Sequence, residues 1–186
     1  MKPISWVAVA LVPAALAAGS AQAQTSATPA RSGTRGPVLG FDLNGSALDV
    51  PSSLTGAPGG AGLGLSLGYG VSDRVSLFTR AGVGYRIGYV DVGARYSFGG
   101  AEARLRPYLD GALTRTGTSA FAGPFYEPAH SRGYGVTGGA GVEYFVIRHV
   151  ALDVGLSHSR GQFTSGTFDG DRFSSTRLNL GVKWHP

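Results

Sequence analysis

His158 and Ser159 are the residues of this chain whose types best suit nucleophilic catalysis, because an imidazole can accept the proton of a serine hydroxyl. They lie in a segment whose apolar residues alternate with a period of two, which is typical of a β-strand. Successive side chains of a strand point to opposite faces, so this imidazole and this hydroxyl cannot approach each other. The sequence therefore favours a protein that is not an enzyme.

Asp169 and Asp171 flank Gly170 in the segment Phe168–Arg172 and offer carboxylate oxygens to a calcium ion. A calcium site needs six or more oxygen ligands, and no further ligands are visible nearby, so we interpret the segment as a polar turn. The chain has no cysteine, no phosphate-binding glycine-rich loop and no histidine cluster with metal-ligand spacing, so no cofactor is expected. Its arginines are scattered singly, and we expect no binding of nucleic acid.

The first 23 residues have the pattern of a signal peptide. Lys2 is followed by an apolar run from Trp6 to Ala18, and residues 21–23 read Ala-Gln-Ala, a small-residue cleavage site. The run is shorter than the ~20 residues that a membrane-spanning helix needs. We therefore predict a signal peptide over 1–23, export, and a flexible N-terminal segment over 24–36.

Eight segments with two-residue alternation follow, separated by turn residues. They span 38–48, 61–70, 74–85, 88–98, 104–115, 133–146, 150–161 and 174–185. No stretch after Pro37 shows the period of an amphipathic helix. The fold class expected over 37–186 is therefore all-β, an eight-stranded antiparallel up-and-down barrel.

Charged residues gather on one parity of these segments. The positions assigned to the apolar face, which include Leu63, Leu65, Leu67 and Tyr69, carry no charged residue. The other parity carries five acidic and five basic residues: Asp42, Arg80, Asp91, Arg95, Arg106, Asp110, Glu143, Asp153, Arg177 and Lys183. A soluble barrel would bury the apolar face, whereas a membrane barrel would turn it toward lipid.

Aromatic residues, connection lengths and strand lengths favour the membrane barrel. Tyr69, Tyr96, Tyr144 and Trp184 end the even-numbered strands on the apolar face, as expected of a periplasmic aromatic girdle. Strands of this length suit a tilted crossing of a bilayer. Connections predicted to be long alternate with short ones: Asp49–Gly60, Thr116–Arg132 and Gln162–Phe173. Phe121, Phe125 and Tyr126 in the second of these either form a contact surface or fold back onto the barrel rim.

Several segments resemble the small eight-stranded outer-membrane β-barrels, the family of the OmpA transmembrane domain, OmpX and the opacity-type "porin family" proteins. They are Leu63–Tyr69, Gly70–Leu77, Gly141–Tyr144 leading into Ala151–Gly155, and the last strand, Leu178–Trp184. The resemblance implies a place in the bacterial outer membrane, recognition of the last strand by the barrel-insertion machinery, and no peptidoglycan-binding domain after the barrel. Lipopolysaccharide is then an expected neighbour, which the formal net charge of +5 suits.

The expected function is a structural or surface-interaction role, with a surface ligand held by the outer loops and the ten interior charges paired to fill the lumen. One alternative is a low-conductance small-solute porin in which these charges line an ion path. A second is a lipid-modifying enzyme, although lipid A deacylases place their histidine and serine two residues apart, whereas His158 and Ser159 are adjacent. A third is a soluble ligand-binding barrel.

Overall fold

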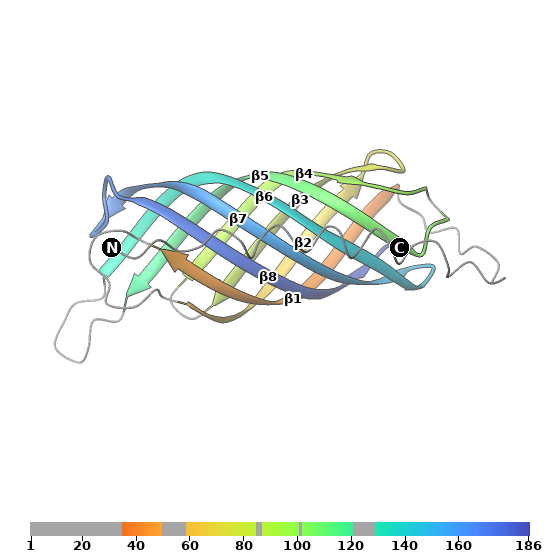
Figure 1. The fold of residues 1–186 in the computed structure, drawn as a ribbon, viewed down its shortest axis with the longest axis horizontal. Helices are drawn as coiled ribbons and strands as arrows, with labels where there is room; N and C mark the ends of the chain where they lie inside the picture. The colour runs from red at the N-terminus through yellow and green to blue at the C-terminus, as the bar shows by residue number, and fades with distance from the viewer. Residues whose placement is uncertain (1–34, 50–58, 85–86, 101, 121–128) are drawn as a thin grey trace, which may run out of the picture.

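The computed structural model describes residues 35–49, 59–84, 87–100, 102–120 and 129–186. These form eight strands: β1 (Gly36–Asp49), β2 (Gly59–Gly70), β3 (Val75–Gly84), β4 (Ile87–Ser97), β5 (Leu105–Ala120), β6 (Ala129–Ile147), β7 (Val150–Gly166) and β8 (Arg172–Trp184). Each strand pairs antiparallel with the next and β8 pairs with β1, which closes the barrel (Figure 1). Within the described ranges no helix is long and apolar enough to cross a membrane. The predicted signal peptide, residues 24–34, and Phe121, Phe125 and Tyr126 lie outside these ranges.

The all-β, eight-stranded antiparallel barrel expected from the sequence is confirmed, and each predicted strand overlaps one observed strand. Two connections were predicted too long. β5 continues to Ala120 and β6 begins at Ala129, within or next to the predicted loop Thr116–Arg132. β7 continues to Gly166 and β8 begins at Arg172, so most of the predicted loop Gln162–Phe173 is strand. Apolar alternation stops in these extensions although the ladder hydrogen bonding continues, so the period-two signal ends before the strand does.

The strands run obliquely to the barrel axis (Figure 1). A row of register partners that starts at Leu39 on β1 and passes through every strand returns to β1 at Asp49, ten residues further on. With ~3.3 Å per residue and ~4.8 Å between strands, this shift corresponds to a tilt of about 40°. The register and the tilt together give the height of each Cα atom along the barrel axis.

The barrel is apolar outside and polar inside. Leu65, Val92 and Leu180 point outward with 65%, 57% and 49% of their surface exposed. Arg95 and Asp153 point inward and are only 8% and 6% exposed. This distribution is the reverse of that in a soluble barrel and matches a barrel with lipid outside.

Candidate functional site

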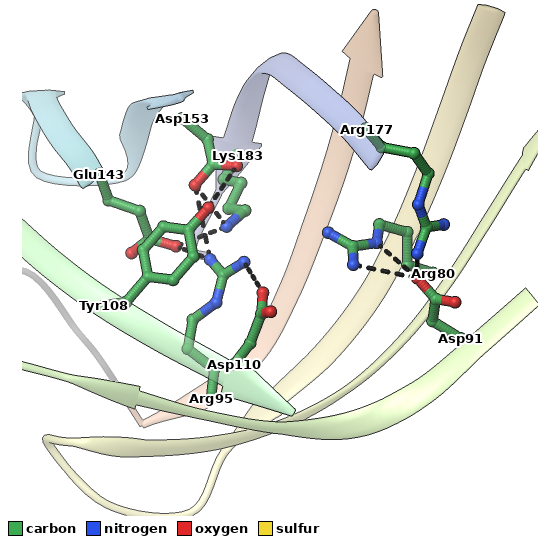
Figure 2. A network of polar contacts seen from close by, with 9 residues as sticks. All are labelled: Arg80, Asp91, Arg95, Tyr108, Asp110, Glu143, Asp153, Arg177 and Lys183. Carbon is green, nitrogen blue, oxygen red and sulfur yellow. Dashed lines mark hydrogen bonds and ion pairs between the residues drawn. The ribbon is translucent and has the colours of Figure 1, made fainter. Parts of the chain in front are cut away.

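The candidate site is a set of ion pairs inside the barrel, arranged in two groups (Figure 2). The first, called here the lower group, lies toward the end with the short turns and consists of Arg95, Asp110, Glu143, Asp153 and Lys183. The Arg95 guanidinium donates to Glu143 Oε1 at 2.6 Å, Asp110 Oδ2 at 3.2 Å and Asp153 Oδ1 at 3.5 Å. Lys183 Nζ donates to the same Glu143 and Asp153 oxygens at 2.6 and 2.8 Å. All five side chains are almost fully shielded from solvent.

Tyr108 covers the lower group. Its ring lies over the Arg95 guanidinium at 3.5 Å from the ring centroid, and its hydroxyl donates to Asp153 Oδ2 at 3.3 Å. Glycines leave room for this ring, because a Cβ atom at Gly141 or Gly155 would overlap the phenol group. The arginine is therefore held both by carboxylates and by an aromatic face.

The second, upper group is centred on Asp91, which is fully buried. Its carboxylate accepts from Arg80 Nε and Nη2 at 3.2 and 3.0 Å, and from Thr114 Oγ1 at 2.8 Å. Arg177 Nη2 lies 2.9 Å from the same carboxylate. The register and tilt place this group about 10 Å above the lower one along the barrel axis.

Hydroxyl groups connect the upper group to neighbouring strands. Arg177 Nη2 donates to Thr137 Oγ1 at 3.3 Å and to Ser159 Oγ at 3.0 Å. Thr137 in turn contacts Thr114 and Ser159 through its hydroxyl. Ser159 therefore faces the lumen as part of the upper group.

Asp42 and Arg106 are the two sequence-predicted charges that belong to neither group, although both are buried. Arg106 Nε donates to the Ala103 carbonyl at 3.2 Å, and its guanidinium lies 4.5 Å from the centroid of the Phe145 ring. Asp42 occupies the space left by Gly64 on the paired strand, where a Cβ atom would overlap its carboxylate. All ten charges thus point inward, and eight of them form the two groups.

A polar cavity remains in the lower part of the lumen. Its lining includes Gly40, Asp42, Ser66, Arg80 and Lys183. Short side chains on β1 and β2 create it, since the longer side chains of β3 to β8 do not fill that side. Two of its lining atoms, Asp42 Oδ1 and Asn179 Oδ1, have no hydrogen-bond partner among the described residues, which fits space for water.

An aromatic and aliphatic cluster closes the lumen at the opposite end. It consists of Leu48, Ile87, Phe163, Phe168 and Phe173, each at most 5% exposed. The centroids of Phe163 and Phe173 are 5.2 Å apart, and those of Phe163 and Phe168 are 5.7 Å apart. Sequence reasoning missed this cluster, although Phe163 and Phe173 share the inward parity of their strands and extending both strands would have found them.

The β7–β8 turn carries the Asp-Gly-Asp motif. Gly170 has φ +86°, a left-handed conformation that favours glycine, and Asp171 N donates to the Phe168 carbonyl at 2.9 Å. Phe168 reaches into the lumen end below it. Among the described residues no group of three histidine, aspartate or glutamate side chains is arranged to hold a metal ion.

His158 and Ser159 point to opposite sides of the barrel wall. His158 is exposed on the outside, where Nδ1 lies 3.0 Å from Thr176 Oγ1 and Arg160 Nε donates to Nε2 at 3.3 Å. Ser159 is 2% exposed and bonded within the upper group. The two side chains therefore form no base–nucleophile pair.

His185 follows the last strand and is buried at the short-turn end, 5% exposed. Its backbone nitrogen donates to the His149 carbonyl at 2.8 Å, and its ring lies 5.1 Å from that of Phe145. Burial and the positive charge of Lys183, partly opposed by Glu143, lower the pKa of His185 to about 4. The imidazole is therefore neutral at pH 7.

Tyr69, Tyr96, Tyr144 and Trp184 all point outward and are 41–59% exposed. The register and tilt place their Cα atoms within about 4 Å of one level on the barrel axis. They therefore form a ring around the short-turn end of the barrel.

No protein-family model matches the sequence, and no curated protein matches it. Solved structures do match. Neisserial surface protein A is similar with a TM-score of 0.60 and 22% identity, over 81% of this chain and 97% of that one. OprG from Pseudomonas aeruginosa has a TM-score of 0.54 and 12% identity over 83% and 97% of the two chains. Ail of Yersinia pestis, crystallised with the heparin analogue sucrose octasulfate, has a TM-score of 0.52 and 12% identity, over 81% of this chain and 99% of that one. The chain therefore has the fold of small outer-membrane barrels, as the sequence resemblance implied.

Proposed function

We propose that this chain is a bacterial outer-membrane protein with a structural or surface-interaction role and a lumen closed by ion pairs. The observation that carries the proposal is the inverted distribution of side chains, with leucine and valine outside and ten charges inside. A closed barrel also pairs its backbone groups between strands, which a bilayer requires. The outward aromatic ring is then the periplasmic girdle, and the opposite end faces the cell surface.

Closure of the lumen is supported by three layers of contacts. The lower group and the upper group each join several strands across the interior, and the cluster around Phe163 lies beyond them. Each charge in these groups has an opposite partner, as buried charges require. A continuous water-filled path would have to break at least one group.

A low-conductance porin is the second candidate, and the cavity beside Asp42 favours it. Two unpartnered polar atoms there, on Asp42 and Asn179, can bond to water, and small side chains of β1 and β2 keep that side of the lumen open. To reach the cell-surface end, a path from this cavity would have to pass the upper group and the cluster around Phe163. The candidate differs from the first in one measurable property, the conductance of the folded barrel.

Planar-bilayer recording separates the two candidates. The closed-lumen proposal expects no steady openings from the wild type, and none from Arg95→Ala, because the upper group and the cluster around Phe163 still close the lumen when the lower group is lost. Arg148→Ala, an exposed turn arginine, is the matched control and should stay silent. Steady wild-type openings that change with Arg80→Ala would establish the porin instead.

Membrane placement itself is tested by fractionation and by a heat-modifiability gel, on which a folded membrane barrel migrates differently when unboiled. Recovery of the chain in the soluble fraction would refute the proposal.

The partners that follow from the proposed membrane placement are outer-membrane lipid, lipopolysaccharide, a surface ligand at the outer loops, and the insertion machinery acting on β8. A lipid-modifying activity predicts altered lipid A acylation, and loss of that activity in His158→Ala.

A further inference from the structure

Three arginines form a basic patch on the outside of the barrel near its cell-surface end. Arg115 on β5, Arg132 on β6 and Arg160 on β7 are all exposed and share the outward parity of their strands. Arg115 pairs in register with Tyr134, two residues from Arg132, and Arg160 pairs with Val136. Their Cα atoms are therefore about 8–14 Å apart, so their long side chains can bring the guanidinium groups together around one ligand. We call these three residues the basic rim.

The basic rim has no acidic counterpart within the described ranges. No carboxylate oxygen there lies within 4 Å of these guanidinium groups, since the ion pairs involve other residues. Arg115 lies 5.9 Å from the Tyr134 ring centroid, and Arg160 Nε donates to His158. The outward carboxylate of Asp49 shares a register row with Arg160 but is two strands away. Three like charges gathered in this way attract an anion.

The height of the basic rim coincides with the outer membrane interface. The register places Arg115 and Arg160 about 20 Å above the aromatic ring at the periplasmic end, and Tyr134 slightly higher. The apolar band of such barrels is ~25 Å tall, so the Cα atoms of Arg115 and Arg160 lie about 5 Å below its upper edge, and their long side chains reach the interface. Arg132 lies higher still, among headgroups. At this level the available anions are lipid phosphates.

An apolar groove begins at the basic rim and descends along the outer wall. Its lining includes Arg115 and Arg132 at the top and Val90, Ala81 and Leu65 below. Val90, Ala81 and Leu65 follow Arg115 along one register row, and the tilt makes this row run toward the membrane centre. Small side chains at Ala81 and at the glycines of this wall hollow the surface. The groove, with a volume of about 570 Å³, runs in the direction that an acyl chain would take from a headgroup at the rim.

We propose that the basic rim binds the phosphate of a phosphorylated glycolipid of the outer leaflet, with one of its acyl chains in the groove below. Guanidinium groups suit this ligand because their paired N–H donors match phosphate oxygens. The proposal rests on the membrane placement proposed above. It adds to that placement a defined lipid site on one side of the barrel, over β4 to β7.

The test uses the full chain refolded in nanodiscs of neutral phospholipid and titrated with fluorescent diphosphoryl lipid A. A parallel titration uses the same glycolipid without its phosphates. The triple variant R115Q/R132Q/R160Q is compared with R74Q/R104Q/R148Q, which removes three exposed arginines from the opposite end. Heat modifiability and vesicle flotation of each protein establish insertion first. At about fivefold in affinity per surface arginine, the rim variant should bind diphosphoryl lipid A about 100-fold more weakly.

The opposite-end variant should retain binding of diphosphoryl lipid A. The wild type should bind the phosphate-free glycolipid only weakly. An inserted chain that binds both glycolipids equally, or loses binding equally in both triple variants, overturns the lipid site and leaves the membrane proposal intact. A chain that fails to insert overturns both. High salt should weaken wild-type binding toward that of the rim variant.

Discussion

Replacing Asp91 by asparagine is expected to lower the free energy of unfolding of the barrel by about 3–5 kcal/mol. The Asp91 carboxylate is fully buried, lies at 3.0 Å from Arg80 and 2.9 Å from Arg177, and accepts a hydrogen bond from Thr114. Asparagine has nearly the same shape but no charge, and its amide NH₂ would face guanidinium donors. Two buried cations would then lack their counter-ion, which accounts for the size of the loss.

The measurement is urea unfolding of the barrel refolded in lipid vesicles, followed by the fluorescence of Trp184. Asp49→Asn is the matched control, since this carboxylate is exposed at the end of β1 and makes no ion pair with the described residues. It should change the stability by less than about 0.5 kcal/mol. The double variant Asp91→Asn with Arg80→Gln should recover at least about 1 kcal/mol, because one uncompensated charge is removed.

A cost for Asp91→Asn no larger than that of the control would refute the reasoning. It would mean that water already solvates Arg80 and Arg177 inside the barrel. The upper group would then be part of a hydrated path, and the porin candidate would be preferred over the closed lumen.

Three further outcomes are expected. His185 has a pKa of about 4 in the folded barrel and ~6.5 unfolded, so folding stability should be constant above pH 6.5 and fall by up to about 3 kcal/mol as the pH drops to 4. NMR titration of the histidines measures this pKa. The urea midpoint of His185→Gln, measured against pH, should lose this dependence. Gly141→Ala should lower the free energy of unfolding, measured with urea, by about 1–3 kcal/mol, because the added Cβ atom would overlap the Tyr108 ring. Gly138→Ala should leave this free energy unchanged, because its Cβ atom meets no other atom. Ala81→Phe fills the outer groove and should speed the release of bound diphosphoryl lipid A, unlike Ala94→Phe elsewhere on the wall.

The sequence predicted the barrel because the charges within its strands gather on one face and the apolar side chains on the other. Leu63, Leu65 and Leu67 alternate with small residues, and the same parity holds in every strand, so strand number and inward face were both readable. The C-terminal ends of β5 and β7 could not be predicted from this alternation. There Arg115, Gln162 and Thr164 take the outward positions in place of apolar side chains, because the wall outside the membrane has water or headgroups on its outer face and no longer needs leucine.

The partners of the interior charges could not be predicted for a different reason. Arg95 and Glu143 are 48 residues apart in the chain and sit on strands that are not paired with each other. Their meeting depends on the ten-residue shift of the closed barrel, which sets the height of each side chain, and on the reach of arginine across the lumen. Alternation fixes the face of a strand, but it contains no information about this shift.

The high glycine content follows from the same narrow interior. A barrel of eight strands encloses little more than the volume of its own inward side chains, so a long side chain on one strand needs a vacant position beside it. The register supplies that vacancy repeatedly, since large or charged inward residues pair with glycines where a Cβ atom would overlap them: Tyr89 with Gly82, Tyr108 with Gly141, Asp110 with Gly139 and Asp42 with Gly64. Glycine weakens an isolated strand, but here each one admits a side chain that bonds across the lumen. These inward glycines and the interior charges are therefore parts of one packing arrangement, in which the glycines provide space that the inward side chains occupy.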